Sequence, residues 1–115
     1  MKLHTLTDAT FGEFAEQNNC LVFFYADWCP LCAAARETLE HLPKERKADW
    51  EAAKVKLAEL NLEHNFRTAD FYGINSVPTV AAFVNGIPVE GKRGLQTAEE
   101  YSELLRIFSA DANNI

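Results

Sequence analysis

The segment from Cys20 to Ala26 constrains the fold more than any other part of the chain. It is short, apolar throughout and rich in aromatic residues. Such a segment is typical of a strand that is buried on both faces in the middle of an α/β sheet. It leads directly into Asp27-Trp28 and then into Cys29-Pro30-Leu31-Cys32. Two thiols separated by two residues, where a strand runs into a helix, predict a pair that exchanges between dithiol and disulfide.

Helix starts are indicated at two places. Thr10 with Glu13, and Thr97 with Glu100, have the spacing of capping boxes. The helix after Thr97 is amphipathic, and the residues expected on its inward face are Tyr101, Leu104, Leu105 and Phe108.

Proline and glycine mark the remaining boundaries. Pro43 should kink or interrupt the helix that starts at the cysteines, because proline lacks the N–H that a helix interior uses. The charged segment 44–54 is expected to continue as helix. Asn85-Gly86 predicts a hairpin turn, because both residues tolerate positive φ. The expected strands are 3–6, 20–26, 55–62, 80–84 and 87–93. The order is then βαβαβαββα, an α/β fold with a central mixed sheet of about five strands flanked by four helices.

Composition restricts the function classes. The chain has 115 residues, 48% of them apolar, which suits a single domain over residues 1–115 with one core. The net charge of −6 argues against nucleic acid as a partner. No stretch is long and apolar enough for a membrane span. Because Met1 to Thr5 does not resemble a signal peptide, we expect a cytoplasmic protein. A chain from which a signal peptide had been removed would give the same result, so a periplasmic or secreted location is the alternative. We also expect a monomer.

Cys20 is the third cysteine and makes the number odd, which does not suit a fully paired disulfide scaffold. We interpret Cys20 as a small buried hydrophobe at the start of the apolar strand. A second redox role is the alternative.

Several motifs together resemble one family. They are Leu6 to Phe11, Leu21 to Cys29, Tyr72-Gly73-Ile74 with Val77-Pro78-Thr79, Phe83 with Asn85-Gly86, and Gly94. In this order, and over nearly the whole chain, the sequence resembles the thioredoxins. A tryptophan before the first cysteine and a later V-P-T make the resemblance specific.

The resemblance implies a thiol–disulfide oxidoreductase with the thioredoxin fold, acting on disulfide-containing protein substrates. Cys29 would be the exposed attacking thiol and Cys32 the buried resolving thiol. Pro78 would be a cis proline facing the disulfide, and Trp28 would flank it. An oxidase or isomerase, and a non-catalytic interaction or redox-sensing module, are the alternatives.

The local sequence supports an activated Cys29. A helix N-terminus favours a thiolate, and Pro30 suits the first helical position, where its missing N–H costs nothing. We expect further apolar residues around the thiols to bind substrate, since a binding site needs apolar surface beside the nucleophile. They are Pro30, Leu31, Val77 and Ile74.

The chain departs from the thioredoxin pattern in two ways. It has Pro30-Leu31 where thioredoxins typically have Gly-Pro, which leaves the redox potential and the direction of exchange open. It also has Phe23 where they typically bury an aspartate, and Glu59 where they have a lysine. Our hypothesis is that Glu59 transfers the proton of Cys32, because it shares strand parity with the inward Leu57. The alternative is that Glu59 reaches solvent.

We expect no cofactor beyond the Cys29–Cys32 disulfide. The sequence has no nucleotide or flavin motif, so the electrons would come from another protein or a small thiol. A zinc site of the cysteines with His4, His41 or His64 is disfavoured, because the sequence lacks a second closely spaced ligand pair. We therefore expect no metal.

Overall fold

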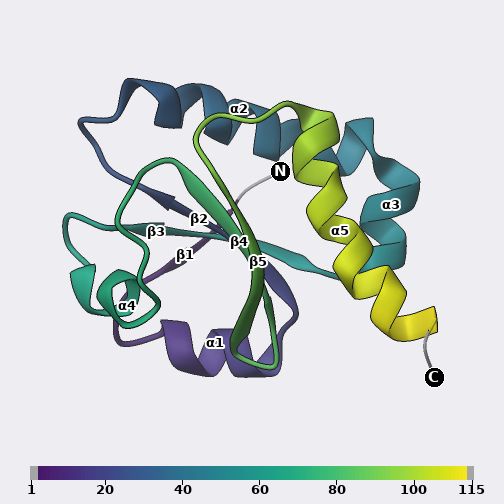
Figure 1. Cartoon of the computed structure of the whole chain (residues 1–115), viewed down its shortest axis with the longest axis horizontal. Helices are drawn as coiled ribbons and strands as arrows, with labels where there is room; N and C mark the ends of the chain where they lie inside the picture. The colour runs from purple at the N-terminus through teal and green to yellow at the C-terminus, as the bar shows by residue number, and fades with distance from the viewer. Residues whose placement is uncertain (1–2, 114–115) are drawn as a thin grey trace.

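Five strands form one mixed sheet in the order β1-β3-β2-β4-β5 (Figure 1). The computed structural model describes residues 3–113, and of residues 109–113 only the backbone. The strands are β1 (His4–Leu6), β2 (Cys20–Tyr25), β3 (Lys56–Asn61), β4 (Thr79–Val84) and β5 (Ile87–Arg93). β1, β3 and β2 are parallel, whereas β4 runs antiparallel to β2 and β5 antiparallel to β4. The predicted α/β thioredoxin fold is confirmed.

β2 is the central strand, and its residues from Cys20 to Phe24 have no exposed surface. The prediction of a strand buried on both faces is therefore confirmed. Alternate residues of β2 enter two different hydrophobic clusters. Leu21 and Phe23 belong to one cluster, and Val22 and Phe24 to the other. The strand thus anchors both halves of the core just before the chain reaches the cysteines.

The helices cover both faces of the sheet (Figure 1). They are α1 (Phe11–Gln17), α2 (Pro30–Glu45), α3 (Lys47–Ala53), α4 (Phe66–Phe71) and α5 (Ala98–Asn113). α2, α3 and α5 lie on one face, and α1 and α4 on the other. The predicted inward residues of α5 are all buried. None of the described helices is both long enough and apolar enough to cross a membrane.

The number of helices differs from the expected four. Pro43 lies inside α2, which continues to Glu45, and the break comes at Arg46, where φ is −122° and ψ is 49°. α3 then begins at Lys47 and makes a separate helix. A proline near the end of a helix removes only one backbone donor, so the last residues can still complete their turn.

The predicted hairpin turn is confirmed. Asn85 and Gly86 both have positive φ, at 53° and 79°, and join β4 to β5. Of the two predicted capping boxes, one forms: the Glu100 amide donates to Thr97 Oγ1, and the Thr97 amide donates to Glu100 Oε1. The other was wrong. The hydroxyl of Thr10 accepts instead from the backbone amide of Thr7.

Candidate active site

The two cysteines lie where β2 gives way to α2. Cys29 is the N-cap of α2, with an extended backbone, and Pro30 is the first helical residue, as predicted. Cys29 and Cys32 form a disulfide, and their Cα atoms are 5.3 Å apart. The Cys29 amide donates to the carbonyl of Ala26 at 3.3 Å, which fixes the turn into the helix. The sequence therefore places both sulfurs at a helix N-terminus in the pairing that the motif predicts.

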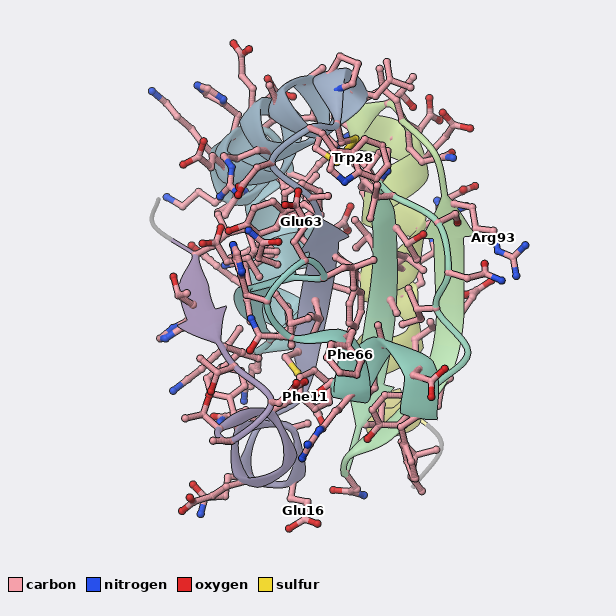
Figure 2. The ribbon with its side chains drawn as sticks, turned by 90° about the vertical axis from the view of Figure 1, so that its left-hand side faces the viewer. Phe11, Glu16, Trp28, Glu63, Phe66 and Arg93 are labelled. Carbon is pink, nitrogen blue, oxygen red and sulfur yellow. A yellow bond between two sulfur atoms is a disulfide. The ribbon has the colours of Figure 1, made fainter. Side chains whose placement is uncertain are left out.

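Both cysteines are more covered than the residues next to them in the chain. Cys29 is 8% exposed and Cys32 4%, so Cys29 is the more accessible but less exposed than predicted. Its side chain belongs to the hydrophobic cluster under α2, which accounts for the difference. Trp28 is 71% exposed and Leu31 50%. Figure 2 shows Trp28 at the end of the molecule where the disulfide lies.

The segment before β4 reaches the same end of the sheet. The Val77–Pro78 peptide bond is cis, as predicted. Phe24 pairs with Thr79, so Pro78 lies at the end of the sheet where β2 runs into the cysteines. The carbonyl of Pro78 accepts a hydrogen bond from the Gly94 amide at 2.7 Å. Val77 packs against the cluster that contains both cysteines.

Ile74 lies apart from this group. It packs against the cluster on the α1 and α4 face, whereas Cys29 and Cys32 belong to the cluster on the opposite face. Its expected part in substrate binding stays a prediction.

A shallow cavity of about 220 Å³ lies beside the disulfide. Its lining residues are Tyr25, Ala26, Asp27, Cys29, Cys32, Ala33 and Arg36. Arg36 is its only basic side chain. The sequence analysis missed this residue, although its position one helical turn after Cys32 was a signal that could have found it.

Glu59 points inward, as predicted from its strand parity. It pairs with Phe23 across β2 and β3, and it is 9% exposed. Its carboxylate forms an ion pair with the guanidinium of Arg36 and accepts a hydrogen bond from Thr5 Oγ1 at 3.1 Å. Both carboxylate oxygens of Glu59 are therefore engaged. The alternative that Glu59 reaches solvent was wrong.

Arg36 is held on a second side by aromatic rings. Its guanidinium carbon lies 4.7 Å from the ring centroid of Tyr25 and 5.2 Å from that of Phe23. The two rings are stacked on each other, 5.3 Å apart. Burial lowers the pKa of Arg36, but the hydrogen bond and the charge of Glu59 outweigh this effect and raise its pKa above the ordinary value. Arg36 is thus a permanent and immobilised cation.

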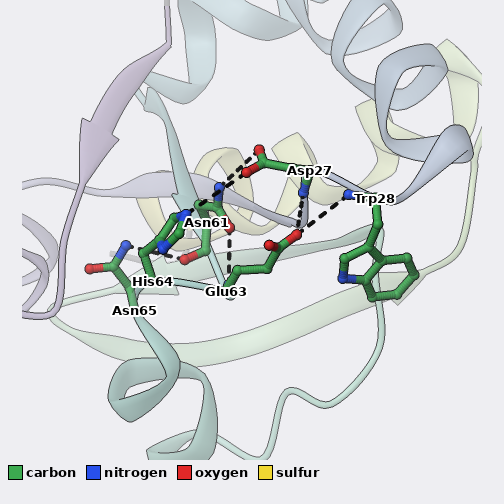
Figure 3. Close-up of polar contacts among 6 residues, drawn as sticks. All are labelled: Asp27, Trp28, Asn61, Glu63, His64 and Asn65. Carbon is green, nitrogen blue, oxygen red and sulfur yellow. Dashed lines mark hydrogen bonds and ion pairs between the residues drawn. The ribbon is translucent and has the colours of Figure 1, made fainter.

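A second set of residues that the sequence analysis missed holds the loop just before Cys29 (Figure 3). Glu63 Oε1 accepts hydrogen bonds from the amides of Asp27 at 2.7 Å and Trp28 at 3.4 Å. Asn61 Nδ2 donates to Asp27 Oδ1 at 3.1 Å, and Asn61 Oδ1 accepts from the Glu63 amide at 2.9 Å. The loop after β3 therefore holds the two residues that precede the nucleophile.

Asp27, Glu63 and His64 also bring three possible metal ligands within 4.8 Å of one another. All three are exposed, and a Glu63 oxygen already accepts from two amides. The group contains neither cysteine and differs from the zinc site considered above. It carries no assignment of a metal.

Comparison with known proteins decides the family. The Thioredoxin family model matches residues 2–106. The chain belongs to the thioredoxin family. The thioredoxin of Staphylococcus aureus is 35% identical over 105 residues, which cover 91% of this chain and 96% of that protein. A mutant thioredoxin of Halobacterium salinarum NRC-1 matches with a TM-score of 0.77 and 26% identity, covering 93% of this chain and 89% of the other.

A structure from work on the thiol-resolving mechanism of yeast mitochondrial 1-Cys peroxiredoxin also has a TM-score of 0.77. At 17% identity, it supports the fold alone. Family membership and the Cys29–Cys32 disulfide together identify a thiol–disulfide oxidoreductase with a redox-active C-x-x-C.

Proposed function

We propose that this thioredoxin-family protein reduces disulfides in protein substrates. The observation that carries the proposal is the position of Cys29 as the N-cap of α2, beside the exposed Trp28 and Leu31. A helix N-terminus favours the thiolate, which is the form that attacks a disulfide. The exposed apolar side chains give a substrate a surface next to the nucleophile.

The proposed reaction has two exchange steps. The Cys29 thiolate attacks one sulfur of the substrate disulfide, and the other substrate sulfur leaves as a thiolate that takes a proton from water. Cys32 then loses its proton and attacks Cys29 Sγ. This attack breaks the mixed disulfide, forms the Cys29–Cys32 bond and releases the second substrate thiolate. Two electrons pass from the protein dithiol to the substrate.

Substrate binding is proposed to use an extended segment laid between two parts of the chain. Trp28, Pro30 and Leu31 are exposed on the α2 side, and Val77-Pro78 comes from the segment before β4. The register between β2 and β4 supports this arrangement, because it brings both parts to one end of the sheet.

The electron supply is proposed to be another protein or a small thiol, with the Cys29–Cys32 disulfide as the only redox group. A cytoplasmic location is also proposed, and the state of Cys20 supports it. Cys20 is a free, buried thiol, and unpaired cysteines suit a reducing compartment.

Insulin reduction with dithiothreitol tests the function. The wild-type protein should accelerate precipitation of the insulin B chain, and Cys29→Ser should abolish the acceleration. Cys32→Ser, reduced and then separated from dithiothreitol before insulin is added, should accumulate a mixed disulfide with insulin that non-reducing electrophoresis detects. An inactive wild-type protein that keeps its internal disulfide under these conditions would favour an interaction or sensing module. The redox potential would then separate a reductant from an oxidant.

A further inference from the structure

A fixed positive charge faces the cavity beside the resolving cysteine. Arg36 follows Cys32 by one turn of α2, a spacing at which Cβ atoms lie about 5–6 Å apart. Both residues line the cavity of about 220 Å³ beside the disulfide. Glu59 is not among the lining residues. Tyr25 lines the same cavity, and its ring centroid lies 4.7 Å from the guanidinium carbon of Arg36. Arg36 therefore borders the cavity that contains both cysteines, whereas Glu59 does not.

The guanidinium is held in this position by contacts on two sides. Glu59 binds it from β3, and the ring of Tyr25 lies 4.7 Å from its central carbon. Thr5 in turn holds the Glu59 carboxylate from β1. A side chain fixed by contacts from β2 and β3 loses little further freedom when charge develops next to it, and electrostatic stabilisation is strongest in such a preorganised site.

We propose that Arg36 is a positioning residue for the second exchange step and holds Cys32 as the thiolate that attacks Cys29. This inference rests on the proposed role of Cys32 as the resolving thiol. Arg36 would then do the work that the family's buried aspartate typically does, but by a different route. It would favour the charged form of the sulfur instead of accepting its proton.

The other ionisable groups near Cys32 are few among the described residues. Tyr25 and Asp27 line the same cavity, and Glu59 forms an ion pair with Arg36. Asp27 has a side chain 65% exposed to solvent, which screens its charge. From α5, Tyr101 directs its hydroxyl to the Gly94 carbonyl at 3.5 Å.

The second exchange step needs no protein side chain as a base. The Cys32 thiol gives its proton to water, and its thiolate attacks Cys29 Sγ. The bond between Cys29 and the substrate sulfur breaks with its electron pair, and the departing substrate thiolate takes up a proton. The substrate disulfide is the oxidant, so the step needs no further reagent.

This proposal and the Glu59 proton-transfer hypothesis predict opposite effects of one substitution. If Glu59 accepts the proton, Glu59→Gln should slow resolution. If Arg36 stabilises the thiolate, Glu59→Gln removes the anion that partly cancels its charge. Cys32 should then ionise at lower pH.

The test is the pH titration of Cys32 in a Cys29→Ala background, followed by the ultraviolet absorbance of the thiolate. Subtracting the Cys29→Ala/Cys32→Ala protein removes the signals of tyrosine and Cys20. Arg36→Met should raise the midpoint by about one pH unit or more. Arg36→Lys should keep the midpoint close to that of the Cys29→Ala parent, because it retains a positive charge. Glu59→Gln should lower the midpoint.

Two further variants guard against an effect of misfolding. Arg36→Met/Glu59→Gln removes both charges without leaving a buried carboxylate unpaired. The midpoint of Cys32 in this protein should still lie above that of the Cys29→Ala parent. Lys44→Met removes an exposed cation of α2 and should leave the midpoint unchanged.

A midpoint that stays in place in both Arg36→Met proteins would overturn the proposal, as would an upward shift in Glu59→Gln. Because the titration needs no substrate, its result is independent of the insulin assay that tests the proposed function.

Discussion

Glu59 lies directly opposite Phe23 across the parallel pair of β2 and β3. Thioredoxins typically bury an aspartate at the position of Phe23 and a lysine at that of Glu59. In this chain the acid is on β3, and its cationic partner, Arg36, comes from α2. The aromatic ring at position 23 contributes to the stack that holds the guanidinium. The differences from the family pattern at positions 23 and 59 are therefore parts of a single rearrangement.

The first prediction concerns the stability of this ion pair. Arg36→Met should lower the free energy of unfolding by about 2 kcal/mol, because it leaves the Glu59 carboxylate buried without its partner. Arg36→Met/Glu59→Met should recover most of the loss, since two apolar side chains of similar volume leave no charge to desolvate. Urea unfolding of the oxidised proteins measures both values. A double variant no more stable than Arg36→Met would contradict the explanation.

How far the sequence predicts this site depends on the range of each interaction. The disulfide pair, the Asn85-Gly86 turn and the Thr97 capping box depend on residues close together in the chain, and all three were predictable. The inward direction of Glu59 followed from strand parity.

The missed features depend on contacts between distant segments. Arg36 and Glu59 are 23 residues apart, and Glu63 binds the Asp27 amide across 36 residues. Nothing local marks these pairings before the strands are ordered. Thr10 shows that a local signal can also fail. Its spacing to Glu13 suits a capping box, but its hydroxyl accepts from the Thr7 amide, which lies three residues before it, as Glu13 lies three residues after it.

The second prediction concerns Cys20. Burial raises its pKa from 9.0 to about 12, so the folded protein should keep it as an unreactive thiol. After reduction, a thiol reagent at pH about 8 should modify Cys29 first, and Cys20 only when denaturant unfolds the chain. Mass spectrometry of the labelled peptides identifies the site. Rapid labelling of Cys20 in the folded Cys29→Ser protein would contradict its burial and revive the alternative of a second redox role.

The same shift predicts a loss of stability in alkali. Because the pKa of Cys20 is higher folded than unfolded, the unfolded chain loses its proton first as pH rises. The contribution of the protonated Cys20 thiol to the free energy of unfolding is complete below pH 9.0 and is lost progressively towards pH 12. In the oxidised protein, Cys29 and Cys32 do not titrate. Urea unfolding across this range should therefore give a smaller decline for Cys20→Ala than for the wild type. If the free energy of unfolding fell equally with pH in both proteins, the raised pKa of Cys20 would be contradicted.

The third prediction concerns Asp8, which joins the segment after β1 to α4. Its carboxylate accepts from the Thr68 hydroxyl at 2.7 Å and from the Thr68 amide at 2.9 Å. Burial raises the pKa of Asp8, but these hydrogen bonds outweigh it and hold the pKa below 3.8. Asp8→Asn should cost about 1 kcal/mol at neutral pH, a small value because the site is close to solvent.

The sign of the pH effect follows from the lowered pKa. The stabilisation by ionised Asp8 is present above pH 3.8 and is lost as pH falls through the lower pKa of the folded state. The difference between wild type and Asp8→Asn should therefore shrink in acid, as urea unfolding at several pH values can measure. A difference that stays constant down to the acid limit would show that the charge of Asp8 is not responsible.

The last prediction concerns Glu63, whose carboxylate holds the Asp27 and Trp28 amides. Glu63→Ala removes this acceptor, so the residues before Cys29 should lose their fixed position. The kcat/KM for insulin reduction should fall several-fold, as small misplacements at an active site are costly. Glu63→Gln keeps an acceptor oxygen and should retain most of the activity.

Glu51→Ala provides the matched control for Glu63→Ala, because Glu51 is an exposed glutamate on α3. It makes the same change in charge and should leave kcat/KM unchanged. If Glu63→Gln were as impaired as Glu63→Ala, the negative charge of Glu63, and not its hydrogen bonds to the loop, would be the property that matters. If neither variant changed kcat/KM, the loop would keep its position without the Glu63 carboxylate. The remaining contacts would then be sufficient, in which Asn61 donates to Asp27 and accepts from the Glu63 amide.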